Sequence, residues 1–291
     1  MSEVFRWLPE LAPFLFLCLL LVWFSLRYAW WRWPIDYRHP RILMYHMVRE
    51  HRRGAAFNKL RVTPRRFERQ LRWLRARGWY FAFVAELTEP ERLPEKTVCL
   101  TFDDGYRDNF IHAHPMLQKY HAKATLYPVV DRCDRDWSVR KKAHHNSGEL
   151  KQEPKLLDAE IREMLDSGLW QLGGHTMTHA NLSRLNGEGK RAEILGGKIR
   201  LAEIFEASPR SFAYPFGIYD EEDMGIVAEA GFETAVTTRN GISRDIRRER
   251  LELRRIKVSG KDTMLAFGLK MRGGSRGMAF GSRGSAKDRK A

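Results

Sequence analysis

The chain has 291 residues, of which 43% are hydrophobic and 12% aromatic, enough for a large folded core and too many for a disordered protein. Its formal net charge of +15 is concentrated at the ends, because residues 1–77 and 239–291 each carry 16 Lys and Arg against 5 Asp and Glu. No zinc-finger, leucine-zipper or RNA-binding motif accompanies this charge, so nucleic-acid binding is not expected. Three widely spaced cysteines exclude a disulfide framework and a cysteine-based zinc site.

The N-terminal segment is apolar and flanked by aromatic residues. Residues 11–26 carry no charge, and they lie between Trp7 and a cluster formed by Tyr28, Trp30, Trp31 and Trp33. With its flanks the segment reaches the ~20 residues that cross a bilayer, and Trp and Tyr are typical of both interfaces. A cleavable signal peptide would have small residues after the run, and a buried helix would have to hide five Trp. We therefore predict a membrane anchor over residues 1–33, single-pass in a bacterial-type cytoplasmic membrane.

Charges around the anchor predict its orientation. From Arg27 to Arg77 there are 15 Lys and Arg against three acidic residues, whereas Arg6 is the one basic residue before the apolar run. The positive-inside rule then places the main domain on the cytoplasmic side. The same cations favour contact with anionic lipid headgroups.

The rest of the chain alternates between strands and helices. Strands are predicted over residues 41–48, 80–84, 97–102, 124–130, 169–172, 212–214, 234–238 and 251–258. Helices are predicted from Thr63 and Pro64 to Gly78, after Gly105 to about Tyr120, and over residues 156–166, 188–206 and 220–230. Residues 131–155 are polar and predict a long loop. This order indicates a parallel α/β domain over residues 34–265, open or closed into a barrel, followed by a flexible basic tail over 266–291.

Two adjacent carboxylates follow a buried strand. Residues 97–102 lead directly into Asp103, Asp104 and Gly105. Successive side chains alternate across a strand, so one carboxylate can bind a metal while the other faces a substrate. The alternative is a turn in which Asp caps the next helix, and the motif alone favours that interpretation.

A histidine pair supplies the second half of a candidate metal site. Gly173 and Gly174 precede His175 and His179, and two His at i and i+4 can share one face of a helical turn. The glycines would let the backbone pass close to a bound group. With Asp104 the pair forms a facial His-His-Asp set, which leaves positions open for water and substrate and suits zinc or another divalent transition ion.

Together these motifs resemble the NodB-like polysaccharide deacetylases of carbohydrate esterase family 4. The resemblance covers about residues 41–258 and rests on TFDDGY at 101–106, HTMTH at 175–179, FAYPFG at 212–217, EAGFETAVTT at 229–238 and LRRIKV at 253–258. It implies an irregular (β/α)7 barrel, here with an N-terminal transmembrane helix. It also implies hydrolysis of N-acetyl groups on an amino sugar, in a saccharide or a lipid-linked glycan.

The resemblance assigns roles to particular residues. Asp103 would be the general base, and Asp104, His175 and His179 would hold a divalent metal, with zinc as the expected ion. A backbone N–H near Phe216, with Tyr214 in the same motif, would help to hold the tetrahedral oxyanion.

One departure from the family concerns the residue that orients the base. Ala213 stands where many members have an arginine. We predict that Arg255 replaces it, as in the Phe-Ala-Tyr-Pro subgroup that this chain resembles. Alternation along the strand lets only one of Arg254 and Arg255 face the barrel.

A second departure concerns the general acid. The family usually has a histidine near the C-terminus, and no histidine follows His179. The proton would come from Asp103 after its step as base, from metal-bound water, or from a residue of the long loop such as His144 or His145. His46 either lines the cleft or is a satisfied core histidine.

Two other functions remain compatible with these residues. The same chemistry cleaves esters, so the protein could be a carbohydrate O-acetyl esterase. The missing acid makes a non-catalytic saccharide-binding homologue conceivable, although retention of Asp103 argues against it.

Overall fold

The computed structural model describes residues 2–133, 135 and 148–274. Their main sheet is parallel throughout and runs in the order β7-β6-β5-β1-β10-β9-β8, with β4 paired to β5. Its strands are β1 Arg41–Tyr45, β4 Tyr80–Phe81, β5 Thr97–Asp104, β6 Ala124–Pro128, β7 Trp170–Leu172, β8 Ser211–Ala213, β9 Thr234–Asn240 and β10 Leu253–Lys257. Short strands β2 Met47–Val48 and β3 Arg61–Val62 pair separately.

The two ends of this sheet meet. Gly174, just after β7, forms a parallel bridge with Phe212 of β8. The Gly174 N–H donates to the Ser211 carbonyl at 2.8 Å, and the Ala213 N–H donates to the Gly174 carbonyl at 2.9 Å. These bonds nearly close the sheet, so the predicted irregular (β/α)7 barrel is confirmed and the open-sheet alternative is not.

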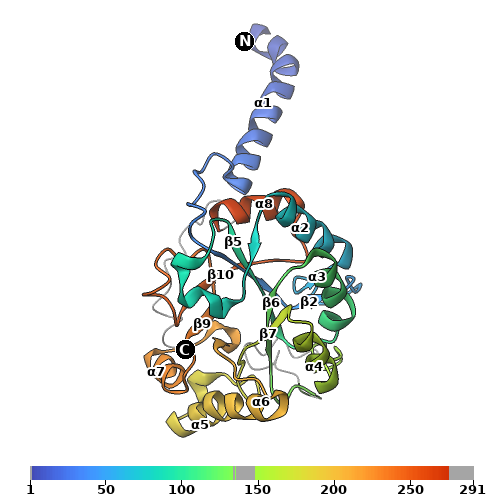
Figure 1. The fold of residues 1–291 in the computed structure, drawn as a ribbon. Coiled ribbons are helices and arrows are strands. Elements are labelled where there is room, and N and C mark those ends of the chain that lie inside the picture. Colours follow the sequence, from blue (N-terminus) through green and yellow to red (C-terminus); the bar gives the residue numbers. More distant parts are fainter. Residues whose placement is uncertain (1, 134, 136–147, 275–291) are drawn as a thin grey trace.

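Helices surround the strands (Figure 1). They are α2 Pro64–Ala76, α3 His114–Tyr120, α4 Asp158–Asp166, α5 Gly187–Arg191, α6 Gly197–Phe205, α7 Glu221–Glu229 and α8 Met264–Gly273. In α2, Phe67, Leu71 and Leu74 recur at helical spacing and are fully buried, which fixes the face turned to the barrel. Thr63 makes no side-chain cap bond, so the start of α2 depends on Pro64 at its first position.

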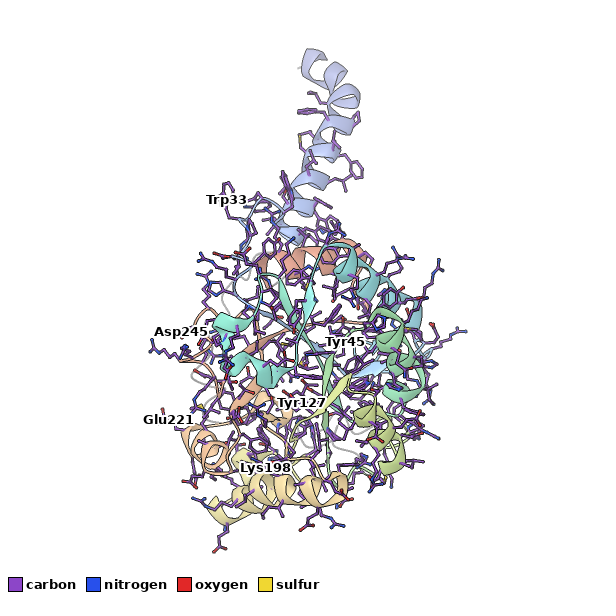
Figure 2. The ribbon with its side chains drawn as sticks, viewed as in Figure 1. Trp33, Tyr45, Tyr127, Lys198, Glu221 and Asp245 are labelled. Atoms are coloured by element: carbon purple, nitrogen blue, oxygen red, sulfur yellow. The ribbon has the colours of Figure 1, made fainter. Side chains whose placement is uncertain are left out.

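Aromatic side chains tie the helices to the strands. Phe102 of β5 stacks on Tyr45 of β1, with ring centroids 5.3 Å apart, and lies 5.1 Å from Trp170 of β7. Phe67 of α2 packs edge-on against Tyr45 at 5.3 Å. Such pairs contribute about 0.5–1.5 kcal/mol each beyond the burial of their area. Tyr45 and Tyr127 lie well inside the side-chain envelope (Figure 2).

Several predicted elements are interrupted. The strand expected over residues 41–48 is divided at His46 into β1 and β2, and the helix expected after Gly105 begins with a π-helical segment, Asn109–Ala113, before α3. The strand expected over residues 80–84 is only β4, because the Val84 N–H donates to the Thr125 hydroxyl and begins a 3-10 turn, Val84–Thr88. The helix expected over 188–206 is broken by a π-helical segment, Ala192–Gly196, between α5 and α6. The Glu193 carbonyl in that segment accepts from the Met177 N–H at 3.0 Å. The π-helical segment therefore contacts the loop that carries His175 and His179, called the histidine loop below.

Helix α1, Ser2–Tyr28, projects away from the barrel (Figure 1). Its window Leu11–Tyr28 has a mean hydropathy of 1.9, and none of it is buried in the protein. By length and composition it could cross a membrane, and a signal sequence has the same properties.

The domain extends further than predicted. Residues 266–273, expected within a flexible tail, belong to α8, and Phe267 and Met271 are buried in the main core. The ordered helix is explained by these two apolar side chains four residues apart, which a count of Gly, Ser, Lys and Arg overlooks. Residues 275–291 of the expected tail lie outside the described residues.

Candidate active site

The Asp pair lies where β5 leaves the barrel. Asp103 and Asp104 end this strand and are 3% and 4% exposed. Alternation turns the two carboxylates in different directions, as predicted, toward different partners. Asp104 has a φ of 75°, so the backbone turns sharply there, before Gly105 at 72°. Neither carboxylate caps the helix that follows, so the alternative of a helix-capping turn is wrong.

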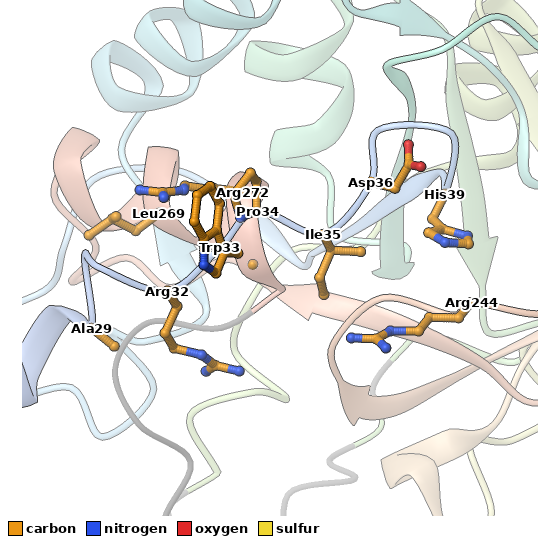
Figure 3. Close-up of a pocket in the computed structure, with 11 residues that line it drawn as sticks. Ala29, Arg32, Trp33, Pro34, Ile35, Asp36, His39, Arg244, Leu269 and Arg272 are labelled. Carbon is orange, nitrogen blue, oxygen red and sulfur yellow. The ribbon is translucent and has the colours of Figure 1, made fainter.

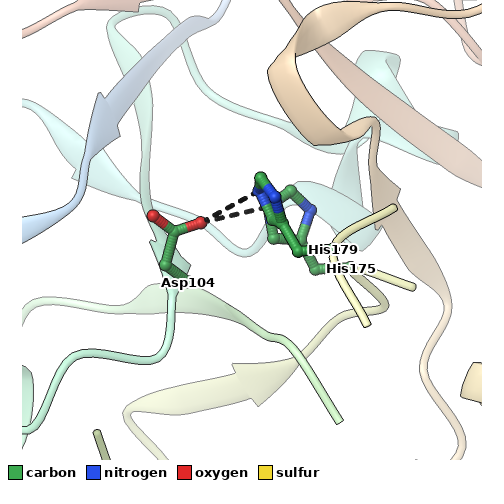
Figure 4. Close-up of side chains that lie close together, drawn as sticks. All are labelled: Asp104, His175 and His179. Carbon is green, nitrogen blue, oxygen red and sulfur yellow. Dashed lines mark ion pairs between the residues drawn. The ribbon is translucent and has the colours of Figure 1, made fainter. Parts of the chain in front are cut away.

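Three side chains converge at Asp104 (Figure 4). Its Oδ1 lies 3.3 Å from Nε2 of His175 and 3.4 Å from Nε2 of His179. One ligand atom from each residue lies within 4.8 Å of the others, and all three residues are buried. Two ligands at ~2.1 Å from a tetrahedral ion would be about 3.4 Å apart, so this spacing fits a divalent ion. The predicted convergence is confirmed.

The hydrogen bonding of His175 also fits a metal ligand. Its Nδ1–H donates to the Ala213 carbonyl at 2.7 Å, which leaves Nε2 as the ring nitrogen that faces the cluster. Burial raises the pKa of Asp104, but hydrogen bonds from His175 and His179 hold that pKa well below its ordinary value. Burial lowers the pKa of His179, which favours the neutral imidazole that metal binding requires.

The histidine loop is not the helical turn expected from the i, i+4 spacing. Thr176 and His179 have φ values of 64° and 56°, so the chain between the two histidines is an irregular loop. Glu193 holds it: its carboxylate accepts from the Thr178 N–H at 2.9 Å and from the Thr178 hydroxyl at 2.6 Å. Long-range bonds therefore place the histidines, a contribution that spacing in the sequence does not reveal.

The glycines before this loop serve packing. A Cβ on Gly173 would collide with the Tyr127 ring, and one on Gly174 would lie 2.7 Å from the Phe232 ring. Both glycines are thus explained by the close approach of core aromatics. The predicted close approach to a bound group is not their reason.

Arg255 pairs with Asp103 inside the barrel. Its Nη1 and Nη2 donate to the two Asp103 oxygens at 2.6 and 2.7 Å, and Nε donates to the Thr237 carbonyl at 2.9 Å. Arg255 is fully buried, whereas Arg254 is half-exposed and faces Glu249. The predicted two-pronged contact and the choice between the two arginines are confirmed.

This contact controls the charge of Asp103. Burial raises the pKa of that carboxyl, but the charge of Arg255 and its hydrogen bonds, with smaller contributions from His46 and His175, hold the pKa below the ordinary 3.8. Asp103 is therefore ionised at neutral pH beside the three-residue cluster.

The two residues expected at the oxyanion differ in position. Phe216, with φ 58° in the turn Pro215–Gly217, packs edge-on against His179 with ring centroids 4.5 Å apart. Tyr214 points into the core: its N–H donates to the Val236 carbonyl, its hydroxyl donates to the Leu251 carbonyl at 3.0 Å, and its ring stacks on Tyr219. The structure thus brings Phe216, and not the polar groups of Tyr214, to the cluster.

His46 is the residue whose role sequence reasoning left open. It follows β1 directly, is half-buried, and its positive charge would lower the pKa of both Asp103 and Asp104. The Asn109 amide donates to the His46 carbonyl at 2.9 Å and holds this strand end. In the sequence, the position of His46 directly after a buried strand is the feature that indicates a place near the site. His144 and His145 lie outside the described residues.

Known proteins share this arrangement of elements. A model of the family described as polysaccharide deacetylase matches residues 91–235. A Bacillus subtilis protein described as a polysaccharide deacetylase is 31% identical over 232 residues, which cover 78% of this chain and 74% of the relative. A solved polysaccharide deacetylase from Bacillus cereus superposes with a TM-score of 0.68 at 27% identity, covering 80% of this chain and 69% of that one.

A further relative has a more specific description. The poly-β-1,6-N-acetyl-D-glucosamine N-deacetylase of Staphylococcus aureus strain MRSA252 is 25% identical over 183 residues. The match covers 59% of either chain, less than two thirds of that protein's length.

Proposed function

The chain belongs to the polysaccharide deacetylase family, the NodB-like group of carbohydrate esterase family 4, and on that premise we propose that it removes N-acetyl groups from an amino-sugar-containing glycan at a membrane. As a member it is a hydrolase of non-peptide carbon–nitrogen bonds. The Staphylococcus aureus relative supports N-acetylglucosamine polymers as the substrate class, and a lipid-linked glycan has the same reactive group.

Asp104, His175 and His179 would hold the metal, for which zinc suits the two imidazoles and one carboxylate. When bound, a divalent ion polarises the acetyl carbonyl and makes water more acidic. The protein supplies the rest of the site. The Ala213 carbonyl orients His175, and the edge of Phe216 packs against His179.

Asp103 is the proposed general base. Arg255 keeps its carboxylate ionised and oriented, so that it accepts the proton of the attacking water. Fixing the acceptor before the reaction avoids the entropic cost of ordering it during the step.

His46 is the proposed proton donor to the departing amine. It is half-buried at the end of β1, and its charge is felt by both aspartates. Histidine is the side chain that most often acts as a general acid or base in enzymes. Asp103, once protonated, is the alternative donor.

The observation that carries this proposal is the buried Asp103–Arg255 pair beside the Asp104, His175 and His179 cluster. Hydrolysis of N-acetylglucosamine oligomers and of an O-acetyl ester should be measured side by side with bound zinc. We expect His175→Ala and His179→Ala to lose both metal and turnover, and Asp103→Asn to keep the metal and lose turnover.

The same assay separates the alternatives. Turnover of the ester alone would identify a carbohydrate O-acetyl esterase. Saccharide binding without turnover of either substrate would identify a non-catalytic homologue.

We also propose that residues 1–33 anchor the enzyme, with the catalytic domain continuing from residue 34 through α8. The exposed apolar window of α1 supports an anchor, and the excess of cations after it favours the cytoplasmic face. Protease digestion of the domain in intact spheroplasts tests the side, because a cytoplasmic domain would be protected.

A further inference from the structure

A basic cavity lies where the anchor meets the barrel. The linker after α1 and the C-terminal end of α8 enclose about 350 Å³, within the roughly 300–1,000 Å³ typical of small-molecule sites. Three arginines line it: Arg32, Arg244 and Arg272. The guanidinium groups of Arg32 and Arg244 extend into the space between the linker and residue 244 (Figure 3).

The described lining of the cavity contains three arginines and one acidic residue. Among the described residues, Asp36 is the acidic residue of the lining, and its carboxylate accepts three hydrogen bonds from Arg38, at 2.8–3.0 Å. The cavity therefore keeps a positive excess, and guanidinium groups bind phosphate oxygens in two-pronged fashion.

The walls of the cavity are held in place. Buried Arg41 donates from Nη2 to the Ile35 carbonyl and from Nε to the Met271 carbonyl, which fastens the linker to the end of α8. Arg272 donates to the Trp30 carbonyl at 2.8 Å, and the Ile35 N–H donates to the Arg272 carbonyl at 3.0 Å. These bonds hold the linker against α8 and fix Arg272 between them.

The surroundings indicate which anion the cavity takes. Its lining begins at Ala29, directly after α1, and no residue of the apolar window of α1 is buried. Trp33 in the lining is 90% exposed, as suits a membrane interface. A second cavity of about 410 Å³ also touches α1, and its lining includes Arg27, Lys59 and Lys261. The linker enters β1 at its amino end, whereas Asp104 ends the parallel strand β5, so this is not the catalytic cleft.

We propose that the cavity lined by Arg32, Arg244 and Arg272 binds the phosphate of an anionic phospholipid headgroup, with the acyl chains lying along α1. The proposal rests on α1 being in a membrane, part of the proposed function. Bound lipid would fix the angle of the barrel against the bilayer, since the cavity joins the anchor to the domain.

The test uses the full chain in nanodiscs of phosphatidylcholine with phosphatidylglycerol, released for native mass spectrometry. The native protein should retain phosphatidylglycerol at least about fivefold over its share in the bilayer, the preference expected for one cation near the lipid. Arg244→Glu should abolish that preference. Arg248→Glu is the matched control: the same charge change on an exposed residue in the same segment that does not line the cavity, and it should retain the lipid.

Each other outcome overturns a distinct claim. Equal retention by native and Arg244→Glu proteins, or no preference in either, would refute the lipid site while leaving the anchor and the deacetylase assay untouched. Displacement of the lipid by an equal concentration of inorganic phosphate would show a site for free anions instead. If the native chain fails to float with pure phosphatidylcholine vesicles, the anchor fails and the lipid site fails with it.

Discussion

The contact between Asp103 and Arg255 controls the charge and orientation of the proposed base. Removing one partner of a buried ion pair typically costs about 3–5 kcal/mol, because the other charge stays buried without compensation. Arg255 is fully buried and donates with both Nη atoms, so this pair belongs in that class. We expect Arg255 to position and ionise Asp103, because it contacts neither of the two histidines nor Asp104 in the hydrogen bonds of its guanidinium group.

We expect Arg255→Ala to keep its zinc and to lose about 10²–10⁴-fold in kcat, the range for disabled general acid–base catalysis. Steady-state kinetics on an N-acetylated oligomer, with zinc measured in the same samples, checks this. Arg254→Ala is the matched control, because that side chain is half-exposed and should change kcat little. A loss in Arg254→Ala alone would contradict the assignment.

The same variant has a pH signature. In the native protein Arg255 holds the pKa of Asp103 below 3.8, so its stabilising contribution persists above that pH and is lost as the pH falls through the folded-state pKa. Without Arg255, only the smaller effects of His46 and His175 oppose burial, so the pKa of Asp103 rises. The acidic limb of kcat/KM should therefore move to higher pH, and Arg255→Lys, which restores charge, should move it part of the way back. A limb that does not move would indicate a purely structural role.

At the scale of elements, the π-helical segment Ala192–Gly196 and the histidine loop form one unit. Glu193 contacts the loop with its carboxylate and its carbonyl, between the two metal-ligand positions. Residues of this kind do not bind the metal themselves, but they orient the side chains that would bind it.

Glu193→Ala should therefore weaken zinc binding by about 10–100-fold while leaving the ligands present. Competition against a chelator of known affinity measures the change. Glu203→Ala, on the exposed face of α6, removes a surface carboxylate and should leave zinc affinity unchanged. Equal affinity in native protein and Glu193→Ala would show that the loop holds its shape without this clamp.

At the scale of the whole molecule, we expect α1 and the barrel to be separable. The apolar window of α1 has no buried part, and the proposed ligands lie in β5 and the loop after β7. Within the linker, Ile35 and Tyr37, which a chain without residues 1–33 retains, pack against the main core.

Deleting residues 1–33 should release a soluble barrel that keeps its fold and its zinc. Size-exclusion chromatography, circular dichroism and metal analysis of the truncated chain check this, with the full chain in detergent for comparison. An unfolded truncated chain would mean that α1 stabilises the barrel and is not only an anchor.

The sequence by itself determined the fold class, the candidate ligands and the base. Strand alternation separates Asp103 from Asp104, and hydrophobic periodicity locates most strands and helices, because both are local properties of the chain. It also narrowed the partner of the base to Arg254 or Arg255, and preferred Arg255.

Tertiary contacts decided the remainder. Glu193 holds the irregular loop that carries the two histidines. The rings of Tyr127 and Phe232 leave no room for a side chain at the two glycines before that loop. The carbonyl of Leu251 accepts the hydrogen bond that turns Tyr214 inward. The domain ends at Gly273, beyond the predicted boundary at residue 265, because Phe267 and Met271 pack into the core. Each of these contacts joins residues that are distant in the chain. Local propensity therefore cannot predict them, and they form only when the barrel brings the two residues together.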